Sequence, residues 1–200
     1  MTKNFFENAN HLSLILILIL ISYFLLMFGN GIISLTHPDE VFYIQSAKEM
    51  VQYNKWFTPM IFDAVQFEKP FVSFALFAAA IKWFGLTPFV ARFWPAFFGM
   101  LGVCVVYWIS FMLFGKKRQA FISGFILTTS FIYLALSRAV LTDMIFSVLV
   151  AMTIGFYYLG YSSKKYKDFG IIFGFFFRKS TWYSSFEEIL VSWFFCCKNL

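Results

Sequence analysis

The sequence predicts an all-α integral membrane protein with about five transmembrane helices and two amphipathic helices on the outer membrane surface. Three observations support this fold class. Of the 200 residues, 60% are hydrophobic and only 13% are charged, whereas a soluble domain keeps about a quarter of its residues charged. Apolar runs long enough to cross a bilayer recur along the chain. The basic residues gather in clusters between these runs, as they do in the cytoplasmic loops of membrane proteins.

The first apolar run, residues 12–35, carries no charged side chain. It exceeds the about 20 residues that a transmembrane helix requires. It is also longer than the core of a signal peptide, and no small-residue cleavage site follows it. We therefore expect residues 12–35 to form the first span.

The segment 36–87 is predicted to be a long extracytoplasmic loop with two surface helices. Pro38 and Asp39 mark the start of the first helix, in which apolar residues recur at helical spacing: Val41, Ile44, Ala47, Met50 and Val51. Such an amphipathic pattern fits a membrane surface. The second helix, 71–84, is apolar but reaches only about 21 Å, which is too short to cross.

Three further spans are expected at 88–114, 120–136 and 144–161, and another apolar run begins at 169–177. The last two of the three spans are joined by a seven-residue turn, 137–143. The positive-inside rule places Lys116–Arg118 and the lysines of 164–167 in the cytoplasm. Counting spans from these clusters places the amino terminus in the cytoplasm, and the loop 36–87 and the turn 137–143 outside.

The net charge of +6 does not indicate nucleic-acid binding, because the basic residues form no single folded face. The three cysteines have no CxxC spacing, which argues against a zinc site or a disulfide scaffold. A lone histidine such as His37 is more typical of a loop than of a metal site. The residues assign no cofactor with certainty and leave a divalent metal open.

Six ionisable residues are predicted to share the outer face: Asp39, Glu40, Glu68, Lys69, Arg138 and Asp143. Each has a structural explanation, since acids complement the start of a helix and Pro70 favours a helix start after Glu68 and Lys69. Gathered at one face, these side chains also have the chemistry that a catalytic site requires. An acid can take a proton from an acceptor, and cations can hold a phosphate.

The order of short motifs resembles the amino-terminal module of the GT-C-type membrane glycosyltransferases. This class includes bacterial aminoarabinose–lipid A transferases and dolichyl-phosphate-mannose protein mannosyltransferases. Each motif is degenerate alone, but seven in this order over residues 1–175 are specific: His37-Pro38-Asp39-Glu40, Trp56-Phe57-Thr58-Pro59, Phe67-Glu68-Lys69-Pro70, Ala91-Arg92-Phe93-Trp94-Pro95, Leu113-Phe114-Gly115-Lys116-Lys117, Ser137-Arg138 and Leu141-Thr142-Asp143.

The resemblance implies transfer of a sugar from a polyprenyl-phosphate carrier to a lipid or protein acceptor at the outer face of a bacterial inner membrane. It implies that Asp39 is the general base or orients the acceptor, with Glu68 and Asp143 as further catalytic acids. It also assigns Lys69 to the carrier phosphate, with Glu40 and Arg138 as further substrate-binding residues. The implied partners are the lipid-linked sugar donor, the lipid or protein acceptor and membrane lipids, but no nucleic acid.

Residues 1–177 form the predicted glycosyltransferase module, and 178–200 form an atypical tail. The tail lacks the Thr-Lys-Gly-Pro-like motif that the resemblance places soon after position 175, so we interpret it as truncated or frame-shifted. Residues 1–200 alone are expected to enter the membrane and to transfer no sugar. The alternative is a non-catalytic membrane protein, either a remnant or a subunit that binds a lipid or a partner. A transporter is less favoured, because the ionisable residues gather at one face and the spans carry few charges.

Overall fold

The structure is a computed structural model that describes Phe6 and residues 9–35, 37–62, 64–65 and 71–162. Most of this part of the chain is helical, which confirms the predicted all-α membrane fold. The elements are α2 (His11–Ser22), the π-helix η1 (Tyr23–Met27), α3 (Pro38–Gln52), β1 (Met60–Ile61), β2 (Ala64–Val65), α4 (Phe71–Phe84), α5 (Pro88–Phe114), α6 (Lys117–Thr129), α7 (Phe131–Arg138) and α8 (Thr142–Ser162).

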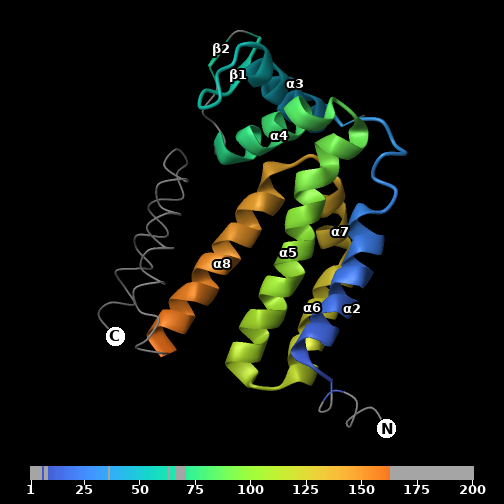
Figure 1. Ribbon diagram of the computed structural model, residues 1–200, viewed down its shortest axis with the longest axis vertical. Coiled ribbons are helices and arrows are strands. Elements are labelled where there is room, and N and C mark those ends of the chain that lie inside the picture. The colour runs from blue at the N-terminus through green and yellow to red at the C-terminus, as the bar shows by residue number, and fades with distance from the viewer. Residues whose placement is uncertain (1–5, 7–8, 36, 63, 66–70, 163–200) are drawn as a thin grey trace.

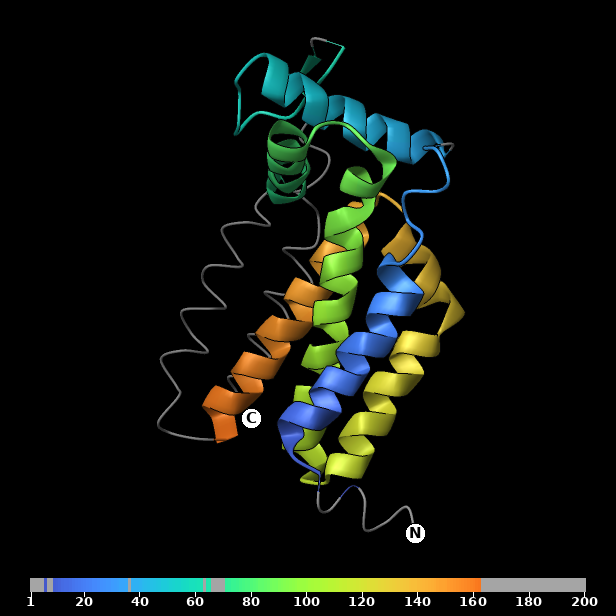
Figure 2. The ribbon, with the colours of Figure 1, turned by 45° about the vertical axis from the view of Figure 1, so that its right-hand side comes forward.

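Helices α2, α5, α6 and α8 run side by side as an elongated bundle, and α3, α4 and the β1–β2 hairpin lie across one end of it (Figures 1 and 2). The same end carries α7 and the start of α8. We call it the α3 end. The connection between α5 and α6 lies at the opposite end, near the amino terminus. The long loop predicted between the first two spans therefore folds as a separate layer on the bundle.

Within the described residues, two helices are long and apolar enough to cross a membrane, namely α5 over Pro88–Phe114 and α8 over Thr142–Gly160. Helices α6 and α7 pass the same test together, as one span bent by 62°. The segments His11–Met27 and Val72–Phe84 are shorter apolar helices. The predicted run at 169–177 lies outside the described residues.

The predicted start of the first surface helix and the bounds of the helices 71–84 and 88–114 agree closely with the structure. The two ends of α5 carry local signals. The hydroxyl of Thr87 accepts a hydrogen bond from the backbone N–H of Val90 at 3.2 Å, and Pro88 follows at the first helical position. Gly115 ends α5 in the left-handed conformation, with φ of 65°, which glycine adopts without steric cost.

Two predicted spans are corrected. The span 12–35 ends already at Met27, after which Phe28 is extended and Gly29 has a φ of 80°. The span 120–136 is not one straight helix, since it breaks at an extended Ser130. Before the break, the hydroxyls of Thr128 and Thr129 donate to the carbonyls of Gly124 and Phe125 at 2.9 and 3.0 Å. At the break itself, the carbonyl of Ile126 accepts a hydrogen bond from the Thr129 hydroxyl at 3.2 Å, and the carbonyl of Leu127 accepts one from the backbone N–H of Ser130 at 3.1 Å. These two bonds supply partners to acceptors near the break, as a lipid environment requires.

One buried cluster holds the surface layer on the bundle. It combines residues of α3, α4, α5 and α8 with the connection before α8: Tyr43, Ile44, Ala47, Met50, Phe74, Phe77, Ala78, Ala91, Val140 and Ile145. A second cluster joins α2, α5 and α6 in the bundle: Leu14, Leu18, Val103, Tyr107 and Ala120. The first cluster therefore fixes α3 against the start of α8, where the predicted site residues lie.

Candidate active site at the α3 end

Asp39 lies in the first turn of α3 with its side chain exposed. The cap of this helix is His37, whose Nδ1 accepts a hydrogen bond from the backbone N–H of Asp39 at 3.4 Å. The side chains of His37 and Asp39 are 66% and 62% exposed, and His37 Nδ1 lies 3.6 Å from Asp39 Oδ2. Since His37 supplies the capping acceptor, the Asp39 carboxylate is not the group that caps α3.

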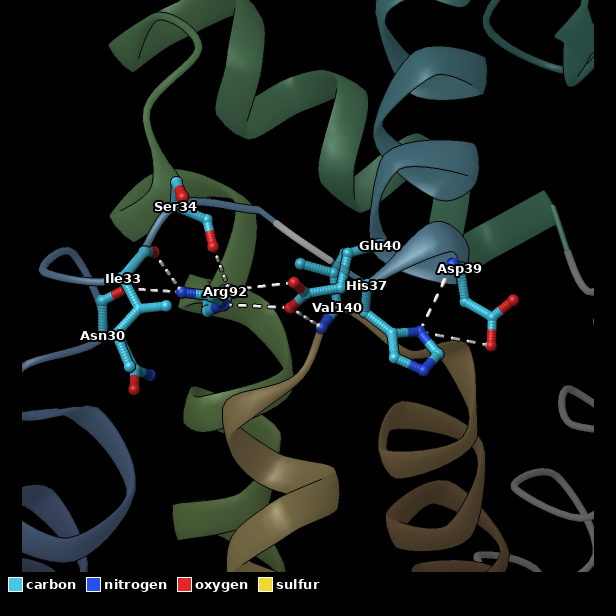
Figure 3. A network of polar contacts seen from close by, with 8 residues as sticks. All are labelled: Asn30, Ile33, Ser34, His37, Asp39, Glu40, Arg92 and Val140. Atoms are coloured by element: carbon cyan, nitrogen blue, oxygen red, sulfur yellow. Dashed lines mark hydrogen bonds and ion pairs between the residues drawn. The ribbon is translucent and has the colours of Figure 1, made fainter.

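Glu40, the next residue, is buried and only 3% exposed. Its Oε1 accepts hydrogen bonds from Arg92 Nε at 2.9 Å and from the backbone N–H of Val140 at 3.0 Å. Its Oε2 accepts from Arg92 Nη2 at 2.8 Å. Figure 3 shows this carboxylate between α3, α5 and the connection from α7 to α8. Glu40 was predicted to bind substrate, but its side chain faces intramolecular partners rather than solvent.

Arg92 is 7% exposed and uses every N–H of its guanidinium within the chain. Besides its two bonds to Glu40, Nη1 donates to the carbonyls of Asn30 at 3.1 Å and Ile33 at 2.7 Å. Its Nη2 also donates to the carbonyl of Ser34 at 3.2 Å (Figure 3). These five bonds match the five donors of an arginine side chain.

Sequence reasoning gave Arg92 no role beyond its place in a motif. The available signal was its position, because it is the only charged residue in the run 88–114. A charged residue inside an apolar span is costly and usually has a partner or a function. The sequence does not identify that partner.

The pKa of Glu40 is lowered from its ordinary value of 4.5. Burial alone raises the pKa, because it penalises the charged form. The opposing contributions outweigh it: the hydrogen bonds from Arg92 and Val140 and the electrostatic interactions with Arg92 and His37 all lower the pKa. Glu40 is therefore held as a carboxylate.

Arg138 is the last residue of α7 and connects it to the end of η1. Its Nη1 donates to the carbonyl of Leu25 at 3.3 Å and its Nη2 to that of Phe28 at 3.0 Å. A cation is favourable at the carboxy end of a helix, where backbone carbonyls lack partners. Its side chain remains exposed, so this structural contact and a contact with an anionic ligand are compatible.

Asp143 lies in the first turn of α8 and is also exposed. The hydroxyl of Thr142 donates to its Oδ1 at 3.4 Å. The bond from Val140 to Glu40 brings the connection between Arg138 and Asp143 to the first turn of α3. The structure thus gathers Asp39, Glu40, Arg138 and Asp143 at the α3 end, as predicted. Glu68 and Lys69 lie outside the described residues.

Among the described residues, no group of three or more His, Cys, Asp or Glu side chains is arranged to hold a metal ion. These residues offer the exposed carboxylates of Asp39 and Asp143, and Arg138 is an exposed cation at the same end of the bundle. The carboxylates can accept a proton, and the cation can bind an anion such as a phosphate.

Residues 12–176 match the model of a family described as dolichyl-phosphate-mannose-protein mannosyltransferase. The chain is 28% identical over 152 residues to an uncharacterised protein of Aquifex aeolicus (strain VF5), covering 76% of this chain and 30% of that protein. It is 34% identical over 125 residues to the undecaprenyl phosphate-α-4-amino-4-deoxy-L-arabinose arabinosyl transferase of Enterobacter sp. (strain 638), covering 62% and 23%. The chain therefore spans less than a third of the length of these relatives.

The fold is similar to the crystal structure of ArnT from Cupriavidus metallidurans bound to undecaprenyl phosphate. The TM-score is 0.67 at 22% sequence identity, and the match covers 76% of this chain and 28% of that one.

Proposed function

The chain belongs to the dolichyl-phosphate-mannose-protein mannosyltransferase family. We therefore propose that it takes part in the transfer of a sugar from a polyprenyl-phosphate carrier to an acceptor hydroxyl. The acceptor is a lipid or a protein, and the reaction takes place at the outer face of a bacterial inner membrane. In this orientation the amino terminus is cytoplasmic, and the α3 end faces outward.

The observation that carries the proposal is the exposed Asp39 carboxylate beside a fully paired Glu40. In the reaction, the bond between the sugar and the carrier phosphate breaks while the acceptor oxygen bonds to the same sugar carbon. The acceptor proton passes to a carboxylate, for which Asp39 is our first choice. The carrier leaves with the bonding electrons as a polyprenyl phosphate.

The remaining site residues receive roles that match this charge movement. Lys69 and Arg138 place positive charge near the carrier phosphate, which gains negative charge as it leaves. Glu68 and Asp143 are further acids that orient the acceptor or take its proton. The donor is a polyprenyl-phosphate-linked sugar, as the names of the Enterobacter relative and of the family suggest for those proteins.

Carrier recognition can be tested on residues 1–200 in lipid nanodiscs. We expect the protein to bind undecaprenyl phosphate about tenfold or more tightly than undecaprenol, which lacks the phosphate, because hydrogen bonds to charged groups are worth about 1.5–3 kcal/mol. Equal binding of the two lipids would contradict the proposal. Transfer from undecaprenyl-phosphate-linked aminoarabinose or mannose to lipid and peptide acceptors is then measured with a chimera that joins this chain to the remaining length of the Enterobacter relative, since residues 1–200 alone are expected to transfer no sugar. Carrier binding without any transfer by the chimera would favour the alternative of a carrier-binding protein.

A further inference from the structure

We propose that Glu40 and Arg92 form a positioning pair that places Asp39 and the turn before Asp143 relative to each other. The pair makes no contact with the substrate itself, and it acts through the backbone of the two exposed acids. This inference rests on the proposed function for its chemical meaning, but the placement that it describes can be measured without any sugar transfer.

The Glu40 carboxylate joins three separate parts of the chain. Glu40 belongs to α3, Arg92 to α5, and Val140 to the connection between α7 and α8. Asp39 precedes Glu40 directly, and Asp143 follows Val140 by three residues. A shift of this one carboxylate therefore changes how α3 meets the start of α8, and with it the separation of the two acids.

Arg92 fixes the approach to α3 as well. Its bonds to the carbonyls of Asn30, Ile33 and Ser34 hold the irregular segment between η1 and α3. A lysine at this position has three donors on a flexible stem and lacks the planar fork of arginine. Arg92→Lys therefore keeps the positive charge but cannot make the same set of bonds.

Two other roles for the pair fit the contacts less well. A substrate contact needs free polar atoms, but both oxygens of Glu40 and all five N–H groups of Arg92 have partners within the chain (Figure 3). A purely stabilising role does not require this geometry, because buried ion pairs are often replaceable by apolar residues without loss of stability. The bonds of the pair join α3, α5 and the connection before α8. They instead match a role in positioning these segments relative to one another.

The position of α3 relative to α7 is measured by pulsed electron spin resonance on the 200-residue chain in nanodiscs, with Cys104, Cys196 and Cys197 replaced. One spin label replaces Val41 in α3 and another replaces Ile132 in α7, since these side chains are 51% and 69% exposed. We expect one narrow distance distribution in the parent. Glu40→Gln keeps the side-chain length without the charge, and Glu40→Asp keeps the charge without the length. Both changes, and Arg92→Lys, should shift or broaden the distribution.

Glu49→Gln is the matched control. Glu49 is also a buried acid of α3, at 5% exposure, but it accepts hydrogen bonds from Gln45 and from the backbone of Phe62 rather than from the bundle. Its substitution should leave the label distance unchanged. Thermal unfolding of each variant shows whether it is folded. If Glu40→Gln does not fold, the label distance in Glu40→Asp decides the question. A distance equal to that of the parent would show that the charge alone is sufficient, and it would overturn the proposal.

Binding of undecaprenyl phosphate to the same variants separates this inference from the proposed function. A positioning pair predicts that Arg92→Lys changes the label distance while carrier affinity stays within about twofold of the parent. A tenfold loss of affinity with an unchanged distance would make Arg92 a carrier contact and overturn the proposal. Failure of the parent to bind the carrier would count against the proposed function alone, since the distance measurement still decides the positioning role.

Discussion

At the scale of single residues, Asp39 and Glu40 are neighbours in sequence but have opposite environments. Adjacent helical residues point about 100° apart, so one carboxylate of α3 faces outward while the other faces the bundle. Glu40 tolerates burial because Arg92 and the Val140 N–H satisfy its charge, and an unpaired buried charge is very costly. The exposed acid is consequently available for chemistry, and the buried one for structure.

Asp39→Asn removes the proposed base without removing the side chain. We expect turnover to fall by about 10²–10⁴-fold, because a positioned general base contributes about that much to the rate. The measurement is sugar transfer by a chimera that joins this chain to the remaining length of the Enterobacter relative. Membrane insertion and binding of undecaprenyl phosphate should be retained.

If Asp39 only complements the dipole at the start of α3, a role worth about 0.3–1 kcal/mol of stability, the substitution should leave turnover nearly unchanged. Turnover within a few fold of the parent would therefore exclude Asp39 as the base, and Asp143 would be the next candidate. Lys69→Ala is the comparison variant. It should weaken both turnover and carrier binding, because its proposed contact is with the carrier phosphate.

Glu40 also predicts how stability depends on pH. Its pKa is lowered in the folded chain, so folding favours the ionised form. The resulting stabilisation is present above the ordinary pKa of 4.5 and is lost as the pH falls through the lower value of the folded state. We expect the parent to lose more thermal stability than Glu40→Gln between pH 7 and pH 3.5. The excess drop in Tm should be about 2–4 °C for each kcal/mol of lost stabilisation. Equal drops in both proteins would contradict the expectation.

At the scale of elements, the short helix α7 depends on close packing against α5. A Cβ atom added to Gly99 would lie 2.7 Å from Ser137 Oγ and 3.3 Å from Leu26 Cδ1. The Tyr133 hydroxyl donates to the carbonyl of Gly99 at 2.6 Å. Small residues permit such approach between membrane helices, and hydrogen bonds add to it. Because α7 ends at Arg138, this packing also positions the connection that leads to Asp143.

Gly99→Ala should therefore lower the free energy of unfolding by about 1–3 kcal/mol, the usual cost of overpacking a filled interface. Thermal unfolding in detergent measures the effect. Adding Ser137→Ala removes the hydroxyl that the new methyl group meets, so the double variant should recover part of the loss. Leu113→Ala, at a side chain that is 52% exposed, is the control and should have a smaller effect. A Gly99→Ala protein as stable as the parent would show that α7 can move away from α5 at little cost.

At the scale of the whole molecule, the surface layer of α3, α4 and the hairpin makes the two ends of the bundle different. Asp39 and Asp143 belong to the α3 end, and Lys117 begins α6 at the opposite end (Figure 1). The spatial arrangement agrees with the span counting that separates the acidic loop from the basic cluster. The orientation in the membrane is still a prediction from the positive-inside rule.

Single cysteines can test that orientation in intact cells, with the native cysteines replaced. Cysteines at positions 39 and 143 should react with an impermeant thiol reagent, because the α3 end is predicted to face outward. Cysteines at positions 117 and 165 should react only after lysis. Labelling of positions 143 and 117 from the same side would contradict the predicted topology.

The sequence by itself determined the helical membrane class, the start of α3, the ends of α4 and α5, and the residues Asp39, Glu40, Arg138 and Asp143 at one end. These features follow from composition, run length and local signals such as Thr87 and Gly115, which act over a few residues. The sequence did not predict the break at Ser130 or the early end at Met27, because an apolar run looks continuous across both. Gly29 and Asn30 were the available signals for that end.

Only the tertiary structure decided which of the two adjacent acids is exposed and which residues pair with the other. Arg92 and Val140 lie 52 and 100 positions from Glu40, so no local pattern can connect them. Their contact arises from the packing of α3 and the connection before α8 around α5. The physical reason is that a buried charge takes its partner from whatever the packed helices bring within hydrogen-bond distance, and that distance is a property of the folded chain.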